Sequence, residues 1–311
     1  MSKTRHERVS EDEEGQRIDN FLIRRCPGVP RSHIYRLIRK GDVRVDGKRI
    51  KQTRKLATGE QVRIPALRVQ VSDAVHVPDR LARTAGRAVL LDHEDFLVVD
   101  KPAGIAVHGG SGLAFGFIDA LRQQLDEPGL DLAHRLDRAT SGCLLIGRSL
   151  KANRALQNLF RRRQITKRYI ALVDGQWPAD LESVQVPLKK NVEHAGERRV
   201  RVDTDGRPAL THFRIQRRFG AATMMEVLLE TGRTHQIRVH ARHVGHGVVG
   251  DTRYGDNARN AWFRQKGLNR LYLHSSALEF TWHGERIAVQ APLDEAWQAS
   301  LVALCAASEP D

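Results

Sequence analysis

The chain has 311 residues, a length that predicts about two domains and a sizeable buried core. Its 51 Lys and Arg residues exceed its 37 Asp and Glu residues, so the formal net charge is +14 and the expected partner is a polyanion. The sequence contains no run of eighteen apolar residues and begins without an apolar signal core, which disfavours a membrane protein and favours a cytoplasmic location.

The positive charge is concentrated near the N-terminus. Residues 17–63 contain fourteen Lys or Arg residues and only four Asp or Glu residues, whereas residues 1–14 are polar and have the composition of a flexible tail. This asymmetry predicts a separate basic module over residues 15–65.

The module has a readable pattern of elements. Apolar spacing predicts two short helices, the second beginning after a Ser32 cap and ending at Gly41. A hairpin through the Asp46–Gly47 turn and a strand at Val62–Ile64 follow. Basic side chains on the faces opposite the apolar positions are the candidate phosphate ligands: Arg31, Arg36, Arg39, Lys40, Arg44, Lys48, Arg49 and Lys51.

A charged run can also be no more than a solvated face, but the density here favours binding. The stretches GQRIDNFL, RSHIYRLIRKGDVRVDGKRI and GEQVRIP resemble the S4 RNA-binding domain. The resemblance implies a module that docks on structured RNA and contacts shape and phosphates more than base edges.

A second domain begins near residue 88. Residues 66–87 contain Pro78 and Gly86 and lack a sustained pattern, so we expect a linker there. Short apolar runs then predict strands, with one helix after Ser149, and indicate an α+β domain over residues 88–311 built on a mixed, mainly antiparallel sheet. The runs are AVLL, FLVVDKP, CLLIG, RYIALV, THFRI, MMEVLL, QIRVH, LYLH and RIAVQAP.

Three segments of this domain carry chemical signals. The first, KPAGIAVHGGSG at 101–112, is rich in glycine but lacks the spacing of a P-loop or a dinucleotide fingerprint. A structural turn is the simpler interpretation, and nucleotide cofactor binding is not expected.

The second segment is LAHRLDRATSGCLL at 132–145, in which Asp137 is the only acid between residues 133 and 150. An Asp before Thr140 and Ser141 can simply cap a turn. The third, TGRTHQIRVHARHVGHG at 231–247, places Arg238 on an expected strand. Its four histidines superficially suggest a metal, but the segment contains no carboxylate or thiolate, so we predict no metal site.

Together these segments offer one carboxylate among many cations. Cleavage of a glycosidic bond develops positive charge on the sugar, which an ionised carboxylate can stabilise, and a neighbouring arginine keeps that carboxylate ionised. Ordinary glycoside hydrolases need two carboxylates, and no second acid is evident here. A reaction in which the departing base re-adds to the same sugar needs no activated water, so one acid suffices.

The motif order is specific. HRLDRATSG, preceded by KPAGIAVH and followed by KRYIALVDG and by TGRTHQIRVH with GDTRYGD, resembles the RluA family of pseudouridine synthases over residues 90–295. The HGGSGL continuation and the S4-like module most resemble members that modify large-subunit (23S) ribosomal RNA rather than tRNA.

The resemblance implies isomerisation of uridine to pseudouridine on a flipped-out nucleotide, without cofactor or metal. It implies that Asp137 is the essential carboxylate, as a nucleophile on C1′ or as the group that handles a glycal intermediate. Arg238 would pair with it, Tyr169 would stack on the uracil and help remove the C5 proton, and Arg135 would take the place of the flipped base.

Two alternatives stay open at this point. The chain could be a non-catalytic RNA-binding protein in which Asp137 only caps a turn, or a nucleosidase that releases free base from nucleic acid. No large exposed apolar stripe is evident, so we expect a monomer.

Overall fold

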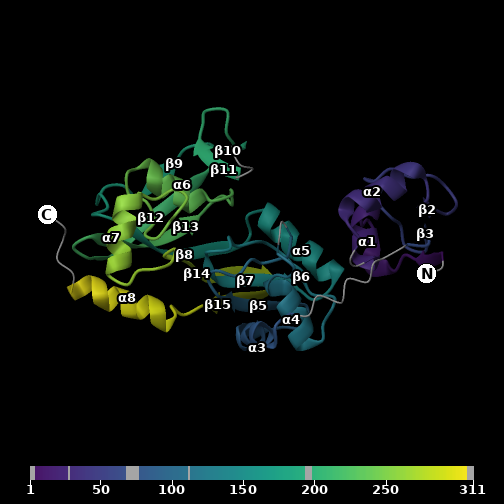
Figure 1. The fold of residues 1–311 in the computed structure, drawn as a ribbon, viewed down its shortest axis with the longest axis horizontal. Coiled ribbons are helices and arrows are strands. Elements are labelled where there is room, and N and C mark those ends of the chain that lie inside the picture. The colour runs from purple at the N-terminus through teal and green to yellow at the C-terminus, as the bar shows by residue number, and fades with distance from the viewer. Residues whose placement is uncertain (1–3, 27–28, 68–76, 111–112, 193–197, 307–311) are drawn as a thin grey trace. The chain divides into compact units, whose positions relative to one another are not determined.

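The chain divides into two compact units in the computed structural model (Figure 1). The first consists mainly of residues 1–78, and the second of residues 79–148 and 152–311. The structure describes residues 4–26, 29–67, 77–110, 113–192 and 198–306.

The first unit combines two helices with a small antiparallel sheet of strand order β1-β3-β2. Its core is formed by Ile18, Phe21 and Leu22 of the first helix together with Ile34 and Ile38 of the second. The elements are β1 (Arg5–Arg8), the short 3-10 helix η1 (Glu11–Glu13), α1 (Ile18–Arg25), α2 (Arg31–Lys40), β2 (Arg44–Val45) and β3 (Gln61–Ile64).

The second helix differs in one detail from the prediction. It begins at Arg31 after Pro30, not after a Ser32 cap, because the fixed backbone of proline suits a helix start. It ends at Gly41, whose φ of 80° is the left-handed conformation expected of a helix-ending glycine.

The expected flexible tail over residues 1–14 is wrong for its described part. Arg5–Arg8 forms an edge strand that pairs with β3, and Glu13 accepts hydrogen bonds from both the backbone N–H and the hydroxyl of Ser10. The strand is held by backbone pairing and its side chains are largely exposed, so no apolar alternation reveals it in the sequence. Val9, which is buried, anchors the segment to the core.

The expected linker over residues 66–87 is also wrong in its second half. Residues 79–87 form α3 (Asp79–Arg87), which buries Ala82 and Ala85 and packs against α4 (Phe117–Leu125). Gly86 lies inside this helix. A side chain is disfavoured at this position, because its Cβ would come within 2.6 Å of Cγ of Gln124. The glycine therefore permits close helix packing and does not mark a chain break.

The second unit contains a ten-stranded sheet, of which eight strands follow the order β4-β5-β7-β14-β8-β13-β12-β9. Two more strands lie off this path, β15 beside β14 and β6 beside β7. All pairs are antiparallel except β7 with β14, which confirms the predicted mixed, mainly antiparallel sheet. The strands are β4 (Val89–Asp92), β5 (Phe96–Lys101), β6 (Asp131–Leu132), β7 (Ser141–Gly147), β8 (Thr166–Asp174), β9 (Ser183–Gln185), β12 (Leu210–Arg218), β13 (Ala222–Leu229), β14 (Leu273–Trp282) and β15 (Glu285–Gln290).

Helices cover this sheet (Figure 1). A separate two-stranded ribbon projects from the second unit and pairs β10 (Leu188–Val192) with β11 (Arg198–Val202). One core cluster packs α5 against β5, β7, β14 and β15, and another packs α7 and α8 against β8. The remaining helices are α5 (Leu150–Arg161), α6 (Gln236–His243), α7 (Asn257–Gln265) and α8 (Glu295–Ala306).

The parallel pair at the middle of the sheet requires a glycine. Gly142 has φ of 104°, and a Cβ there would lie 2.2 Å from the carbonyl oxygen of Ser275 on β14. The Thr-Ser-Gly end of the HRLDRATSG motif therefore lets β7 approach β14 closely, directly after the loop that carries Asp137.

Candidate active site

Asp137 lies on the loop between β6 and β7. Its side chain is 30% exposed, so an outside molecule can reach it. Its carboxylate contacts Arg238 and His235, which lie far along the chain, and is not used to cap its own turn. The loop itself is closed by backbone hydrogen bonds, including Thr140 N–H to the Asp137 carbonyl at 3.1 Å.

A buried lysine holds the backbone next to this loop through hydrogen bonds. Lys101 donates Nζ to the carbonyl oxygens of Pro102 at 2.7 Å, Ile105 at 3.0 Å and Arg138 at 3.3 Å. Burial lowers the pKa of Lys101 to about 7, and the charge of Asp137 acts in the opposite direction. The KPAG segment, interpreted from the sequence as a turn, thus holds the backbone next to Asp137 in place.

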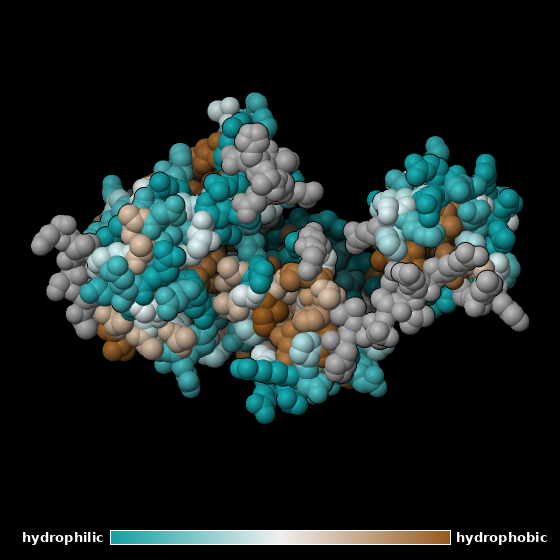
Figure 2. Space-filling view, in the orientation of Figure 1, coloured by the Kyte–Doolittle hydropathy of each residue, from teal (hydrophilic) through white to brown (hydrophobic). Residues whose placement is uncertain are grey.

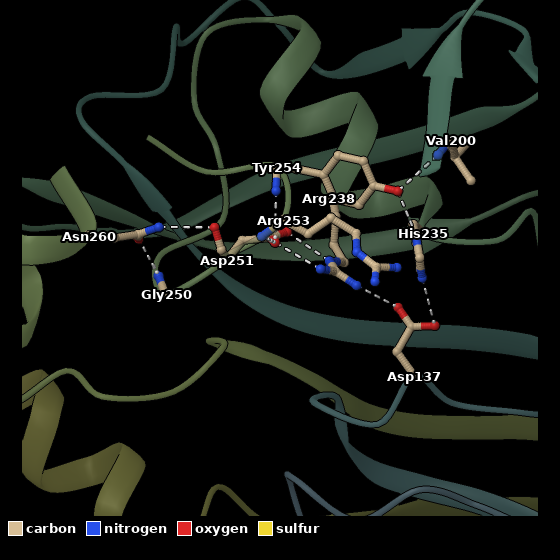
Figure 3. Close-up of polar contacts among 9 residues, drawn as sticks. All are labelled: Asp137, Val200, His235, Arg238, Gly250, Asp251, Arg253, Tyr254 and Asn260. Atoms are coloured by element: carbon tan, nitrogen blue, oxygen red, sulfur yellow. Dashed lines mark hydrogen bonds and ion pairs between the residues drawn. The ribbon is translucent and has the colours of Figure 1, made fainter. Parts of the chain in front are cut away.

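Arg238 lies between two carboxylates (Figure 3). Its Nη1 donates to Oδ2 of Asp137 at 3.1 Å, while Nε and Nη2 donate to the two oxygens of Asp251, each at 2.7 Å. Burial disfavours the charge of Arg238, but the two carboxylates outweigh it and hold its pKa above the usual value. The guanidinium is therefore a fixed cation that faces Asp137.

The expectation that Arg238 lies on a strand is wrong, because QIRVHARH forms helix α6. All residues of this helix from Gln236 to Ala241 are buried. A helix buried on every side has no polar stripe, so its period cannot be recognised from a short apolar and polar alternation.

Asp251 is the functional residue that the sequence interpretation missed. Its side chain is 0% exposed, and Oδ1 also accepts the backbone N–H groups of Arg253 at 2.9 Å and Tyr254 at 3.1 Å. Burial would raise the pKa of this carboxyl, but the bonds from Arg238 and the backbone lower it, so Asp251 is ionised. Asp251 belongs to the GDTRYGD stretch that the motif resemblance included. That stretch contains two acids, and the sequence alone does not show which of them turns toward the site.

Tyr169 is on β8 and is almost completely buried. Burial raises the pKa of Tyr169 to about 12, and the nearby charge of Asp137 acts in the same direction. The phenol is therefore neutral at pH 7. Asp137 and Arg238, both selected from the sequence, come together although they stand on a loop and a helix, and the charge of Asp137 acts on Tyr169 of β8.

Arg135 is on the same loop as Asp137, two residues before it, and its side chain is exposed. Among the residues that the structure describes, it has no ion-pair partner. Its guanidinium is thus free to reach an incoming molecule.

The candidate phosphate ligands of the first unit are exposed, and their charges are unpaired within the described part of the chain. Other cations of this unit are neutralised: Arg17 pairs with Asp19 at 2.6 Å and Arg54 with Glu60 at 2.6 Å. Figure 2 shows hydrophilic residues over much of the visible face of this unit. The exposed set is Arg36, Arg39, Lys40, Arg44, Lys48, Arg49 and Lys51, while the side chain of Arg31 lies outside the described residues.

Part of this set surrounds a concavity. Lys48, Arg49 and Lys51 line it together with Arg54, and its volume is about 510 Å³. Arg49 is fixed here because Nη2 donates to the carbonyl oxygen of Lys40 at 2.6 Å. The surface combines unpaired positive charge with a hollow that a phosphate backbone can enter.

No cluster of three His, Cys, Asp or Glu side chains in the described ranges has an arrangement able to hold a metal ion. No helix among these residues is both long and apolar enough to cross a membrane.

Comparison with known proteins identifies the family. The model of the RNA pseudouridylate synthase family matches residues 95–243, and that of the S4 domain matches residues 16–62. Ribosomal large subunit pseudouridine synthase C of Yersinia pestis is 46% identical over 301 residues, which cover 95% of this chain and 94% of that protein. The chain belongs to the RNA pseudouridylate synthase family.

Further relatives agree with this. The protein of the same name from Escherichia coli (strain K12) is 47% identical over 294 residues, covering 92% of each chain. Among solved structures, human RNA pseudouridylate synthase domain containing 1 matches with 26% identity and a TM-score of 0.56, covering 72% of this chain and 96% of that one. The human domain containing 4 protein has the same fold at 24% identity, with a TM-score of 0.61 and coverage of 73% and 96%.

Membership of the RNA pseudouridylate synthase family confirms the resemblance inferred from the motifs. The chain is a pseudouridine synthase, hence an isomerase, with an N-terminal S4 domain. Asp137, Tyr169 and Arg238 lie within the matched residues 95–243, whereas Asp251 lies just beyond them.

Proposed function

We propose that this synthase isomerises specific uridines of large-subunit (23S) ribosomal RNA to pseudouridine, with Asp137 as the essential carboxylate. The names of the relatives, which cover almost the whole chain, support this substrate. In the reaction the N1–C1′ bond breaks, the uracil turns and C5 bonds to C1′. C5 loses a proton and N1 gains one, so no co-reactant is consumed.

One observation carries the assignment of Asp137. It is a carboxylate that is partly open to solvent and is held against a buried arginine, whose charge is itself secured by Asp251. The carboxylate of Asp137 accepts a hydrogen bond from this fixed cation at 3.1 Å. An ionised carboxylate can then stabilise or capture the developing positive charge at the ribose C1′ carbon.

The remaining site residues receive roles from their positions. Tyr169, whose phenol is neutral, stacks on the uracil, and it can relay the C5 proton only by passing on its own hydroxyl proton. Arg135, exposed at the rim of the same loop, fills the space that the flipped nucleotide leaves. The exposed cations of the first unit bind RNA phosphates, and we assign the same role to Arg31 from its place in the sequence.

The mechanism needs no cofactor and no metal, since the carboxylate, the phenol and the base itself supply every group that reacts. We assign the enzyme to the cytoplasm, where ribosomal RNA is assembled, and expect it to act as a monomer. In the described residues the large apolar side chains that are exposed are Leu113 and Val302 alone, too few for an extensive apolar interface.

The test compares the unmodified protein with Asp137→Asn in cells that lack the gene. Carbodiimide mapping of total large-subunit RNA should find pseudouridines that the unmodified protein restores and Asp137→Asn does not, although the variant still binds RNA. A variant that restores them fully would show that the Asp137 carboxylate is not needed for the reaction. Free uracil and an abasic sugar in a purified reaction would favour a nucleosidase.

A further inference from the structure

The two carboxylate oxygens of Asp137 have different neighbours. Oδ2 accepts Nη1 of Arg238 at 3.1 Å, whereas Oδ1 faces Nε2 of His235 at 3.6 Å (Figure 3). The proposed chemistry uses the arginine but assigns nothing to the histidine. The side chain of His235 is only 11% exposed, so it belongs to the interior of the site and not to the protein surface.

The other ring nitrogen of His235 is tied to a tyrosine. Nδ1 lies 2.6 Å from the hydroxyl oxygen of Tyr254, which also accepts the backbone N–H of Val200 at 3.0 Å. The hydroxyl has a single hydrogen, and within the described residues His235 is the only acceptor in reach of it. If Tyr254 donates to Nδ1, a neutral His235 carries its proton on Nε2, the nitrogen that faces Asp137.

The backbone supports a dedicated orientation of this ring. His235 has φ of 54°, a left-handed conformation that is unfavourable for a residue with a Cβ, and stands directly before α6. The side chain of Gln236 holds that conformation, because its Oε1 accepts the hydroxyl of Thr231 at 2.7 Å and the N–H of Arg233 at 3.0 Å. The strained conformation aims the imidazole at Asp137.

The charges around the ring keep it neutral. Burial lowers the pKa of His235, and Arg238 and Arg253 act in the same direction, against Asp137 and Asp251. A neutral His235 is not a counter-ion of Asp137, and with its proton on Nε2 it can donate toward Oδ1. The cation in contact with the Asp137 carboxylate is Arg238.

We propose that His235 is a positioning residue that fixes the second oxygen of Asp137, and that Tyr254 sets the tautomer that allows it to do so. The inference rests on the proposed action of Asp137 at the ribose. The separation of 3.6 Å is longer than a hydrogen bond, and we expect it to shorten when RNA fills the site, because catalytic contacts often tighten on substrate binding. With Arg238 on one oxygen and His235 on the other, the plane of the carboxylate is set before the nucleotide arrives.

The first test is a substitution series at His235 and Tyr254. His235→Leu removes the donor, while His235→Gln keeps an N–H group at the position of Nε2 under the same backbone strain. In single-turnover reactions on large-subunit RNA from cells lacking the gene, we expect His235→Leu to be slower by roughly 10- to 100-fold. His235→Gln should recover most of that loss, and RNA affinity should stay within about twofold in both, because neither variant removes a phosphate contact.

Tyr254→Phe tests the tautomer. It removes the hydroxyl, and the matched control Tyr272→Phe removes a buried hydroxyl, bonded to Ser300 at 2.6 Å, that is not part of the site. We expect Tyr254→Phe to be several-fold slower and Tyr272→Phe to keep the unmodified rate. Nitrogen-15 NMR of histidine-labelled protein should show a protonated Nε2 at His235 in the unmodified protein and a mixture of tautomers in Tyr254→Phe.

Asp137→Asn separates the two ideas. If Asp137→Asn is inactive while His235→Leu reacts at the full rate, the positioning role is wrong and the proposed function stands. If Asp137→Asn is active, the proposed function itself fails. A reaction of His235→Gln as slow as that of His235→Leu would also overturn the inference. So would an NMR spectrum of the unmodified protein with the proton on Nδ1 of His235, and this measurement does not depend on how the variants fold.

Discussion

Asp251 holds Arg238 through two parallel hydrogen bonds of 2.7 Å each, so the guanidinium has only Nη1 left for Asp137. This geometry separates two tasks. The buried Asp251 compensates the charge of the arginine and fixes its plane, while the partly exposed Asp137 remains available to substrate. A single arginine bound to a single carboxylate would have occupied both oxygens of the reacting group.

The Asp251→Ala variant should therefore be strongly destabilised. Removing one partner leaves a buried arginine uncompensated, a loss that typically costs about 3–5 kcal/mol. Urea unfolding measures this free energy. Asp251→Asn keeps the shape and part of the hydrogen bonding, so we expect a smaller loss of stability but a clear fall in the single-turnover rate. An unchanged rate would show that the orientation of Arg238 does not depend on the charge of Asp251.

The stability of the second unit should depend on pH through His240. This residue is completely buried, and burial lowers its pKa to about 4, so the folded protein keeps it neutral while the unfolded chain protonates it near pH 6.5. The stabilisation is complete above pH 6.5 and is lost as the pH falls toward 4. One proton corresponds to about 1.4 kcal/mol per pH unit, so His240→Gln should flatten the dependence by about that slope. Unfolding curves from pH 4 to 7 with the same slope in both proteins would contradict this.

RNA binding should weaken with salt in proportion to the phosphate contacts of the first unit. Replacing Lys48, Arg49 and Lys51 by Gln removes exposed, unpaired charges and should make the plot of log affinity against log salt shallower by roughly 0.7 to 0.9 per lost contact. Arg286→Gln is the control, because Arg286 is an exposed cation of the second unit and does not line this hollow. Equal slopes for the triple variant and the control would mean that this surface does not bind RNA.

Arg135→Ala should show a defect that depends on RNA structure. The side chain is exposed and packs against nothing in the described fold that the site requires, so stability should change little. Unstacking a base costs a few kcal/mol and is least in unpaired RNA, so the rate should fall more on a structured RNA than on an unstructured one that carries the same uridine. A single-turnover rate that falls equally on both would point to a role in the chemistry.

The sequence predicted the parts of the fold whose pattern is local and regular. The fully buried β7 appears as the apolar run CLLIG, and the Ala152 and Leu156 face of α5 appears at helical spacing. Prediction failed where backbone pairing or packing replaces pattern. The β1 strand has exposed side chains, and α3 contains a glycine that serves a contact with Gln124.

The candidate site divides in the same way. Asp137 stood out because a lone acid in a cationic stretch is unusual, and motif resemblance supplied Arg238 and Tyr169. Asp251 and Tyr254 could not be assigned, since their roles depend on a guanidinium and an imidazole that stand 13 and 19 residues earlier in the chain. Only the folded geometry shows which of several acids and aromatic residues turn toward the loop of Asp137.

The parallel pairing of β7 with β14 bears on when the enzyme can first work. Strand β7, which follows the Asp137 loop, pairs with β14 (Leu273–Trp282), which is made more than 120 residues later in the chain. During translation the loop therefore lacks this support until ribosomal synthesis has passed Trp282. The S4 domain at residues 16–62 is complete long before that point, so a nascent chain gains its RNA-binding module before its Asp137 loop gains this support.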